Sequence, residues 1–82
     1  MSYPKVKLVK ALDNYQLIVR FDNNQTKQYD VSPLLKKAMF SPLKNLALFK
    51  AVKVENGGYA VVWNEDIDIS EYELWQHGQP IP

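Results

Sequence analysis

Residues Asp30 to Phe49, D-V-S-P-L-L-K-K-A-M-F-S-P-L-K-N-L-A-L-F, decide the fold of this 82-residue chain. Within this stretch, Ser32-Pro33-Leu34 is repeated as Ser41-Pro42-Leu43. Serine favours the N-cap of a helix, and proline favours the first helical position, where its missing N–H costs nothing. The second proline also ends the first helix by Phe40. The stretch therefore predicts two short capped helices, which persist only by packing on other elements.

Three antiparallel strands are predicted before the helices. Apolar residues alternate most regularly in the second strand, where Ile18 is an exception on the polar face. In the first strand the adjacent Leu8 and Val9 break the alternation, which indicates either a β-bulge there or burial of both faces of the strand. The predicted strands span residues 5–12, 15–22 and 25–31.

Two strands, a further edge strand and a last helix are predicted after the central stretch. Residues 52–55 and 59–63 are the two strands, and residues 66–69 add the short edge strand. Ser70-Glu71-Tyr72-Glu73 matches a capping box, in which Ser70 caps the helix and Glu73 reaches back to the Ser70 amide. The helix is expected to end at Gly78, as its C′ residue.

The predicted fold class is α+β, with a mainly antiparallel sheet and the element order β-β-β-α-α-β-β-α. Short helices pack on the sheet and form the second of two layers. The chain is expected to be a single domain over residues 1–82, with an ordered core of about residues 4–77 and a short C-terminal tail.

The charges are balanced in number but uneven along the chain. Ten Lys and Arg residues oppose nine Asp and Glu residues, a balance that argues against a dedicated nucleic-acid binder. All the basic residues precede Glu55, and the rest of the chain is acidic. Either these are two solvated faces of opposite sign, or the basic first half meets an acidic partner.

No cysteine is present, which excludes disulfides, thiolate metal sites and thiol catalysis. The first residues lack the apolar run of a signal peptide, and no segment has the ~20 apolar residues that span a bilayer. We therefore expect a cytoplasmic protein without membrane contact.

No catalytic, cofactor-binding or metal-binding residue is predicted. His77 is the sole imidazole, either a general base or metal ligand or, as we expect, a solvated helix end without a second ligand at suitable spacing. Asp66-x-Asp68-x-Ser70 begins like a calcium loop, but Glu71 and His77 occupy the positions that require Gly and Glu. The sequence thus predicts a protein that is not an enzyme.

A partner surface is the remaining candidate site. Tryptophan is enriched in protein interfaces, so Trp63 and Trp75 are the candidates for a partner surface, although a place in the core is what we expect for each. Asp66 and Asp68 complete the candidate partner surface. The outer face of the sheet and the acidic C-terminal segment are where we expect any function to lie.

Several motifs together resemble the domain-of-unknown-function 2442 family. They are Pro4-Lys5-Val6, Phe21-Asp22, Tyr29-Asp30-Val31-Ser32-Pro33-Leu34-Leu35, Phe40-Ser41-Pro42-Leu43, Ala47-Leu48-Phe49, Val52-Lys53-Val54, Val61-Val62-Trp63 and Asp66-Ile67-Asp68-Ile69. The resemblance implies a small bacterial α+β domain without assigned catalytic residues. Some members are fused to a helix-turn-helix and others are encoded in toxin–antitoxin-like pairs. No helix-turn-helix follows here, so direct DNA binding is not expected.

We therefore predict a non-enzymatic protein-interaction or regulatory module, the antitoxin-like half of a two-protein system. A DNA-associated accessory domain of a transcriptional regulator and a small-ligand binder are the alternatives. The expected partner is another protein. A homodimer formed through an exposed strand edge is the alternative, because a small sheet has edges to protect.

Overall fold

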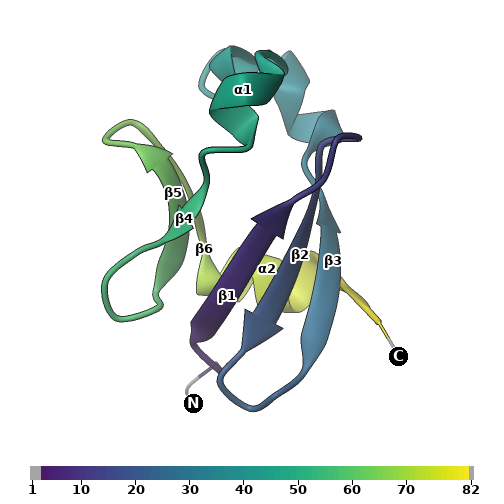
Figure 1. The fold of residues 1–82 in the computed structure, drawn as a ribbon, viewed down its shortest axis with the longest axis vertical. Helices are drawn as coiled ribbons and strands as arrows, with labels where there is room; N and C mark the ends of the chain where they lie inside the picture. Colours follow the sequence, from purple (N-terminus) through teal and green to yellow (C-terminus); the bar gives the residue numbers. More distant parts are fainter. Residues whose placement is uncertain (1–2, 82) are drawn as a thin grey trace.

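The first three strands form an antiparallel meander in the computed structural model, which describes residues 3–81 (Figure 1). In sheet order, the strands of this first sheet are β1 (Val6–Ala11), β2 (Gln16–Phe21), β3 (Thr26–Asp30) and β7 (Gln79–Pro80). The three predicted strands are confirmed. Of the two explanations for the broken alternation in β1, the structure has the irregular pairing, because the register of β1 against β2 shifts between Val6 and Leu8, just before the adjacent Leu8 and Val9.

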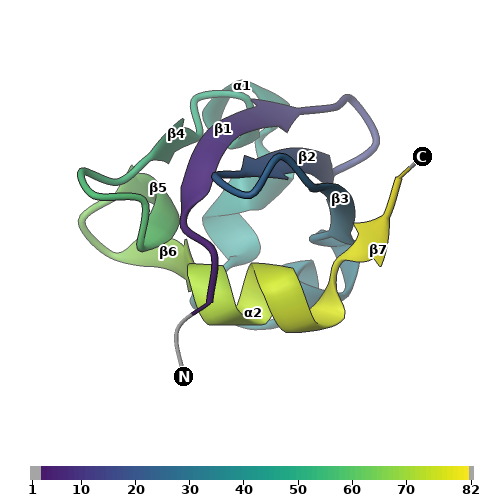
Figure 2. The same ribbon diagram turned by 90° about the horizontal axis from the view of Figure 1, so that it is seen from below.

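The segment predicted as a C-terminal tail forms β7 along the edge of β3 (Figure 2). Gly78 leaves the last helix in an extended conformation, with φ −72° and ψ 151°, so the chain continues beside β3. Gly78 does not have the left-handed conformation common at C′. Glycine is required there for space, because a Cβ would lie 2.5 Å from the Leu74 carbonyl oxygen. Pro80 in β7 fits the rule that proline is confined to edge strands.

A second antiparallel sheet contains β4 (Lys53–Val54), β5 (Ala60–Asn64) and β6 (Ile67–Ser70), in that order. The predicted edge strand is confirmed as β6. The α+β class and the antiparallel pairing are confirmed as well, while the strands divide between two sheets instead of one. The two sheets form opposite sides of the molecule, with α1 closing one end and α2 the other (Figures 1 and 2).

The central stretch forms three single turns, and the two predicted helices are wrong in detail. Two turns are 3₁₀ helices, η1 (Ser32–Lys36) and η2 (Ser41–Lys44), and the third is α1 (Leu46–Phe49). Each segment is too short for more than about one turn, and such turns often close with i→i+3 hydrogen bonds.

Serine does not cap these turns as predicted. The Ser32 hydroxyl donates to Asp30 Oδ1 over 2.6 Å, and the Ser41 hydroxyl donates to the Ala38 carbonyl over 3.1 Å. Asn45 is the residue that caps α1, since its side-chain oxygen accepts the N–H of Ala47 over 3.0 Å. Ser32 and Ser41 are the first residues inside these turns, whose N-cap residues are Val31 and Phe40, so neither hydroxyl lies at the cap position.

The last helix, α2 (Glu71–His77), has half of the predicted capping box. The Ser70 hydroxyl accepts the Glu73 N–H over 3.1 Å, as expected. The Glu73 side chain does not return to the Ser70 amide but accepts a hydrogen bond from the Tyr29 hydroxyl over 2.9 Å. A tertiary partner thus replaces the local one.

The core fills the space between the two sheets and below the turns. Its fully buried large side chains are Phe21, Phe49, Leu17, Leu43, Ile67, Leu74, Val19, Val31 and Val61. These residues come from both sheets, from the central stretch and from α2, so each layer depends on the others for burial. Met39, in the central stretch, does not join this core and is 52% exposed. Among residues 3–81, the helices lack the length and apolar character needed to cross a membrane.

The β4–β5 turn predicts the outcome of two glycine substitutions. Gly58 has φ +78°, and a Cβ there would lie 2.5 Å from the Val6 carbonyl oxygen, a backbone atom that cannot move aside. We expect Gly58→Ala to lower the free energy of unfolding by about 2–4 kcal/mol in urea denaturation.

Gly57→Ala is the matched control. Gly57 has φ +95°, but the nearest atoms to its added Cβ belong to the exposed Tyr59 ring at 3.0 Å, which can rotate away. Only backbone strain of about 1–2 kcal/mol is expected. Equal losses for the two variants would contradict a close contact between Gly58 and β1.

Candidate functional site

Trp63 lies in the core and not on a partner surface. Its side chain is 6% exposed, and its indole N–H donates to the Phe49 carbonyl over 2.8 Å. The ring also stacks on Phe49, with 6.0 Å between the ring centroids. Trp63 is therefore a core residue, because a buried, hydrogen-bonded indole is not accessible to another protein.

Trp75 is half-buried and its ring is largely occupied by the protein itself. It meets Phe21 edge-on, with centroids 5.1 Å apart, and the Lys27 ammonium lies 3.8 Å from the Trp75 centroid. Asp66 and Asp68 are exposed, in the β5–β6 turn and on β6 respectively. The four predicted residues therefore do not form one continuous surface.

The outer face of the first sheet has an apolar centre flanked by cations. The bulge in β1 turns Leu8 outward, where it is 57% exposed and opposite Arg20 of β2. Lys10 is opposite Ile18 in the same pair of strands. We call Leu8, Lys10, Ile18 and Arg20 the basic sheet face. With Val9 and Thr26 these residues line a shallow hollow of about 370 Å³.

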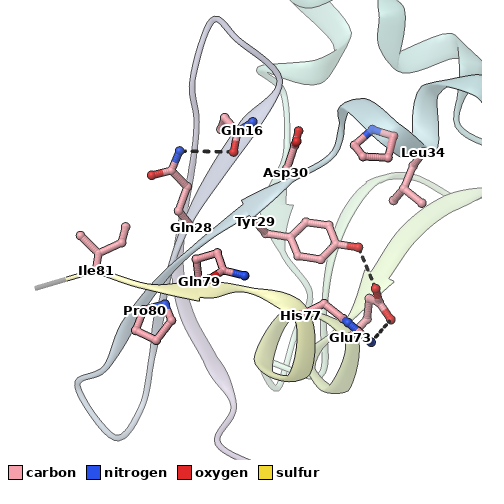
Figure 3. Close-up of a pocket in the computed structure, with 11 residues that line it drawn as sticks. Gln16, Gln28, Tyr29, Asp30, Leu34, Glu73, His77, Gln79, Pro80 and Ile81 are labelled. Carbon is pink, nitrogen blue, oxygen red and sulfur yellow. Dashed lines mark hydrogen bonds and ion pairs between the residues drawn. The ribbon is translucent and has the colours of Figure 1, made fainter.

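A larger pocket of about 680 Å³ lies where β3, η1, α2 and β7 meet. Figure 3 shows the Tyr29 side chain pointing across it toward Glu73 and His77 of α2. The Tyr29 hydroxyl donates to Glu73 Oε2 over 2.9 Å, and His77 Nε2 lies 3.8 Å from Glu73 Oε1. The three side chains form a polar chain along one wall of the pocket.

The Tyr29 phenol is held in its neutral form. Burial raises its pKa most strongly, and the hydrogen bond to Glu73 and the negative charges of Glu73 and Asp30 raise the pKa further. A phenolate would lose hydration and face two carboxylates, so the neutral donor is favoured.

His77 is exposed at the end of α2, as expected for a solvated helix end, and it also lines this pocket. The sequence did not identify the pairing of Tyr29 with Glu73, since Glu73 was assigned to the capping box and Tyr29 was not singled out as a site residue. The sequence offered one indication of this pairing. The Glu73 carboxylate, in the first turn of α2, can accept a hydrogen bond either from the Ser70 amide or from a side chain elsewhere in the fold. Within residues 3–81, no three His, Cys, Asp or Glu side chains are placed to hold a metal ion.

The raised pKa of Tyr29 predicts a loss of stability at alkaline pH. The phenol of an unfolded chain ionises near pH 10, whereas the folded protein keeps the proton above that value. The stabilisation is therefore complete below about pH 10 and is lost as the pH rises toward the folded-state pKa. Tyr29→Phe is expected to lose about 1–2 kcal/mol of unfolding free energy at neutral pH and to show a weaker alkaline decline.

The measurement is urea denaturation of the wild type and Tyr29→Phe across the alkaline range. Tyr59→Phe is the control, because Tyr59 is exposed and its stability curve should parallel that of the wild type. If the stability of Tyr29→Phe fell in parallel with that of the wild type above pH 10, ionisation of the Tyr29 phenol would not cause the alkaline loss of stability.

A protein family described as "Protein of unknown function (DUF2442)" matches residues 6–80 of the chain. Comparisons with the curated proteins and with the solved structures each gave no match. The family match covers all strands and helices described above, and it agrees with the resemblance carried by the central stretch. The chain therefore belongs to the DUF2442 family.

Proposed function

We propose that this chain is a non-enzymatic protein-interaction module that binds an acidic partner protein through the basic sheet face. In the same proposal it regulates that partner, as the antitoxin-like half of a two-protein system. The observation that carries the proposal is the apolar hollow over β1 and β2, which is flanked by Lys10 and Arg20. The solvent-facing side of an antiparallel sheet is usually polar, so apolar side chains there need an explanation.

The composition of the basic sheet face favours a protein over a nucleic acid. An exposed leucine beside a half-buried isoleucine offers apolar area to a side chain of the partner. Arginine is enriched in protein interfaces, where its stem packs and its guanidinium pairs. Two cations are few for a nucleic-acid surface, which needs many phosphate contacts for affinity.

The charge of the face indicates the charge of its partner. Lys10 and Arg20 are exposed, and no carboxylate is among the described residues that line the hollow. An acidic partner would gain from both cations, and its association rate and affinity would fall with added salt. A partner with an apolar side chain between acidic residues would match the hollow and its rim.

The test compares two double variants of the tagged chain in its native host. Leu8→Gln/Arg20→Gln removes one apolar side chain and one cation from the basic sheet face. Met39→Gln/Lys36→Gln removes an apolar side chain and a cation from exposed positions of the central stretch, as the matched control. Quantitative mass spectrometry should find an acidic protein with the wild type and the control, and about tenfold less with the face variant.

Calorimetry on the purified pair then measures the affinity directly. We expect the Kd of the face variant to rise by about tenfold or more, and the wild-type Kd to rise with salt. The proposal fails if no specific partner is found, or if both double variants bind it equally. Light scattering on the chain alone identifies self-association, which would replace the foreign partner with a second copy.

A further inference from the structure

The β4–β5 turn contains an asparagine that is followed directly by a glycine, Asn56-Gly57. The Gly58 N–H closes the turn by donating to the Glu55 carbonyl over 2.8 Å. Gly57 has φ +95°, a left-handed conformation that glycine adopts without steric cost. Both Asn56 and Gly57 are exposed. Water can therefore reach the Asn56 side-chain amide and the peptide bond that follows it.

Asn56 differs from the other five asparagines of the chain in its hydrogen bonds. The peptide nitrogen that follows the asparagine already donates a hydrogen bond in three cases, those of Asn14, Asn23 and Asn24. The side-chain oxygen already accepts a backbone N–H in the other two cases, Asn45 and Asn64. Among the residues that the structure describes, neither the Asn56 side chain nor the Gly57 N–H has a hydrogen-bond partner. Both groups are therefore free to react with each other.

The two groups are the reactants of asparagine deamidation. The Gly57 nitrogen attacks the carbonyl carbon of the Asn56 side chain and loses its proton, and ammonia leaves, which closes a succinimide ring. Water then opens the ring at one of its two carbonyl carbons, so that overall one water enters and one ammonia leaves. One opening gives aspartate, and the other gives isoaspartate, in which the main chain runs through the side chain of residue 56. Because Gly57 has no Cβ, its nitrogen is less hindered than that of any other residue type.

The turn is packed too closely to accept isoaspartate. The Val6 N–H donates to the Gly58 carbonyl over 2.8 Å, and a Cβ on Gly58 would lie 2.5 Å from the Val6 carbonyl oxygen. Isoaspartate inserts one more carbon into the main chain between residues 56 and 57, which displaces Gly58 from Val6. It also adds a carboxylate next to Glu55, whereas aspartate adds the same charge and leaves the length of the main chain unchanged.

We propose that Asn56 is a site of spontaneous deamidation, and that its conversion to isoaspartate detaches the β4–β5 turn from β1. The contact between this turn and β1 joins the two sheets, so the modified chain is less stable and the reaction limits the lifetime of the folded protein. The site shares no residue with the basic sheet face, so it stands or fails separately from the proposed function.

The first experiment incubates the purified chain in mildly alkaline buffer at physiological temperature and follows each asparagine by mass spectrometry of tryptic peptides. No lysine or arginine follows Lys53, so Asn56 and Asn64 lie in one peptide, residues 54–82. Fragmentation by electron transfer separates the two positions and distinguishes isoaspartate from aspartate. Conversion at Asn56 should be at least about tenfold faster than at any other asparagine, and isoaspartate should be among the products.

Two variants connect the rate to the chemistry. Gly57→Ala hinders the attacking nitrogen and should slow the conversion of Asn56 by about tenfold. Asn14→Gln is the control, because it removes an exposed asparagine in another turn and should leave the rate at Asn56 unchanged. Equal rates in the wild type and Gly57→Ala would overturn the proposed site. So would conversion at Asn56 no faster than at the other asparagines while a synthetic peptide of residues 53–60 reacts in the same buffer.

The second experiment tests the detachment of the turn. The isoaspartyl form is isolated by chromatography, and exchange of the Val6 amide hydrogen, which the Gly58 carbonyl accepts, is measured by NMR. This exchange should be at least about tenfold faster than in the wild type. Asn56→Asp is the matched control, since it carries the same charge on a main chain of normal length and should keep Val6 protected. Equal exchange in the isoaspartyl form and in Asn56→Asp would overturn the detachment.

Discussion

The contact between the β4–β5 turn and the first strand holds the two sheets around one core. The Val6 N–H donates to the Gly58 carbonyl over 2.8 Å, and beside it Lys5 pairs with Glu71 over 3.1 Å. Glu71 in turn donates its N–H to the Tyr59 carbonyl over 2.9 Å, so the turn, β1 and α2 meet at one place. Each sheet alone would expose an apolar face, and a chain of this size buries only about 60% of its surface. Both sheets can bury their apolar faces against each other only when this contact between the β4–β5 turn, β1 and α2 is formed.

Local signals in the sequence were sufficient where a residue has one partner close in the chain. The alternation over residues 15–22 predicted β2, and the Ser70 hydroxyl caps α2 as expected. These signals failed at the Ser-Pro-Leu repeats. Ser32 and Ser41 lie inside single 3₁₀ turns whose N-cap residues are Val31 and Phe40, and the side-chain cap of α1 comes from Asn45.

The candidate sites follow the same division. Leu8 and Ile18 were visible as breaks in an alternating pattern, and the structure places both on the outer face of the first sheet. The Tyr29–Glu73 hydrogen bond joins residues 44 positions apart, and no local pattern encodes such a pair. Trp63 lies in the core, as expected, and its indole N–H donates to the Phe49 carbonyl at the end of α1, a partner that the sequence does not indicate. Residue type alone did not separate a core tryptophan from an interface one.

The pairing of β7 with β3 has a consequence for biosynthesis. The ribosome releases the N-terminal segment first, so the meander can form while residues 79–80 are still being added. During that interval β3 is an open edge at Lys27 and Gln28, where a neighbouring nascent chain could pair. The edge is polar and carries a lysine, which discourages such pairing, and Pro80 finally covers it with a residue that has no N–H to donate.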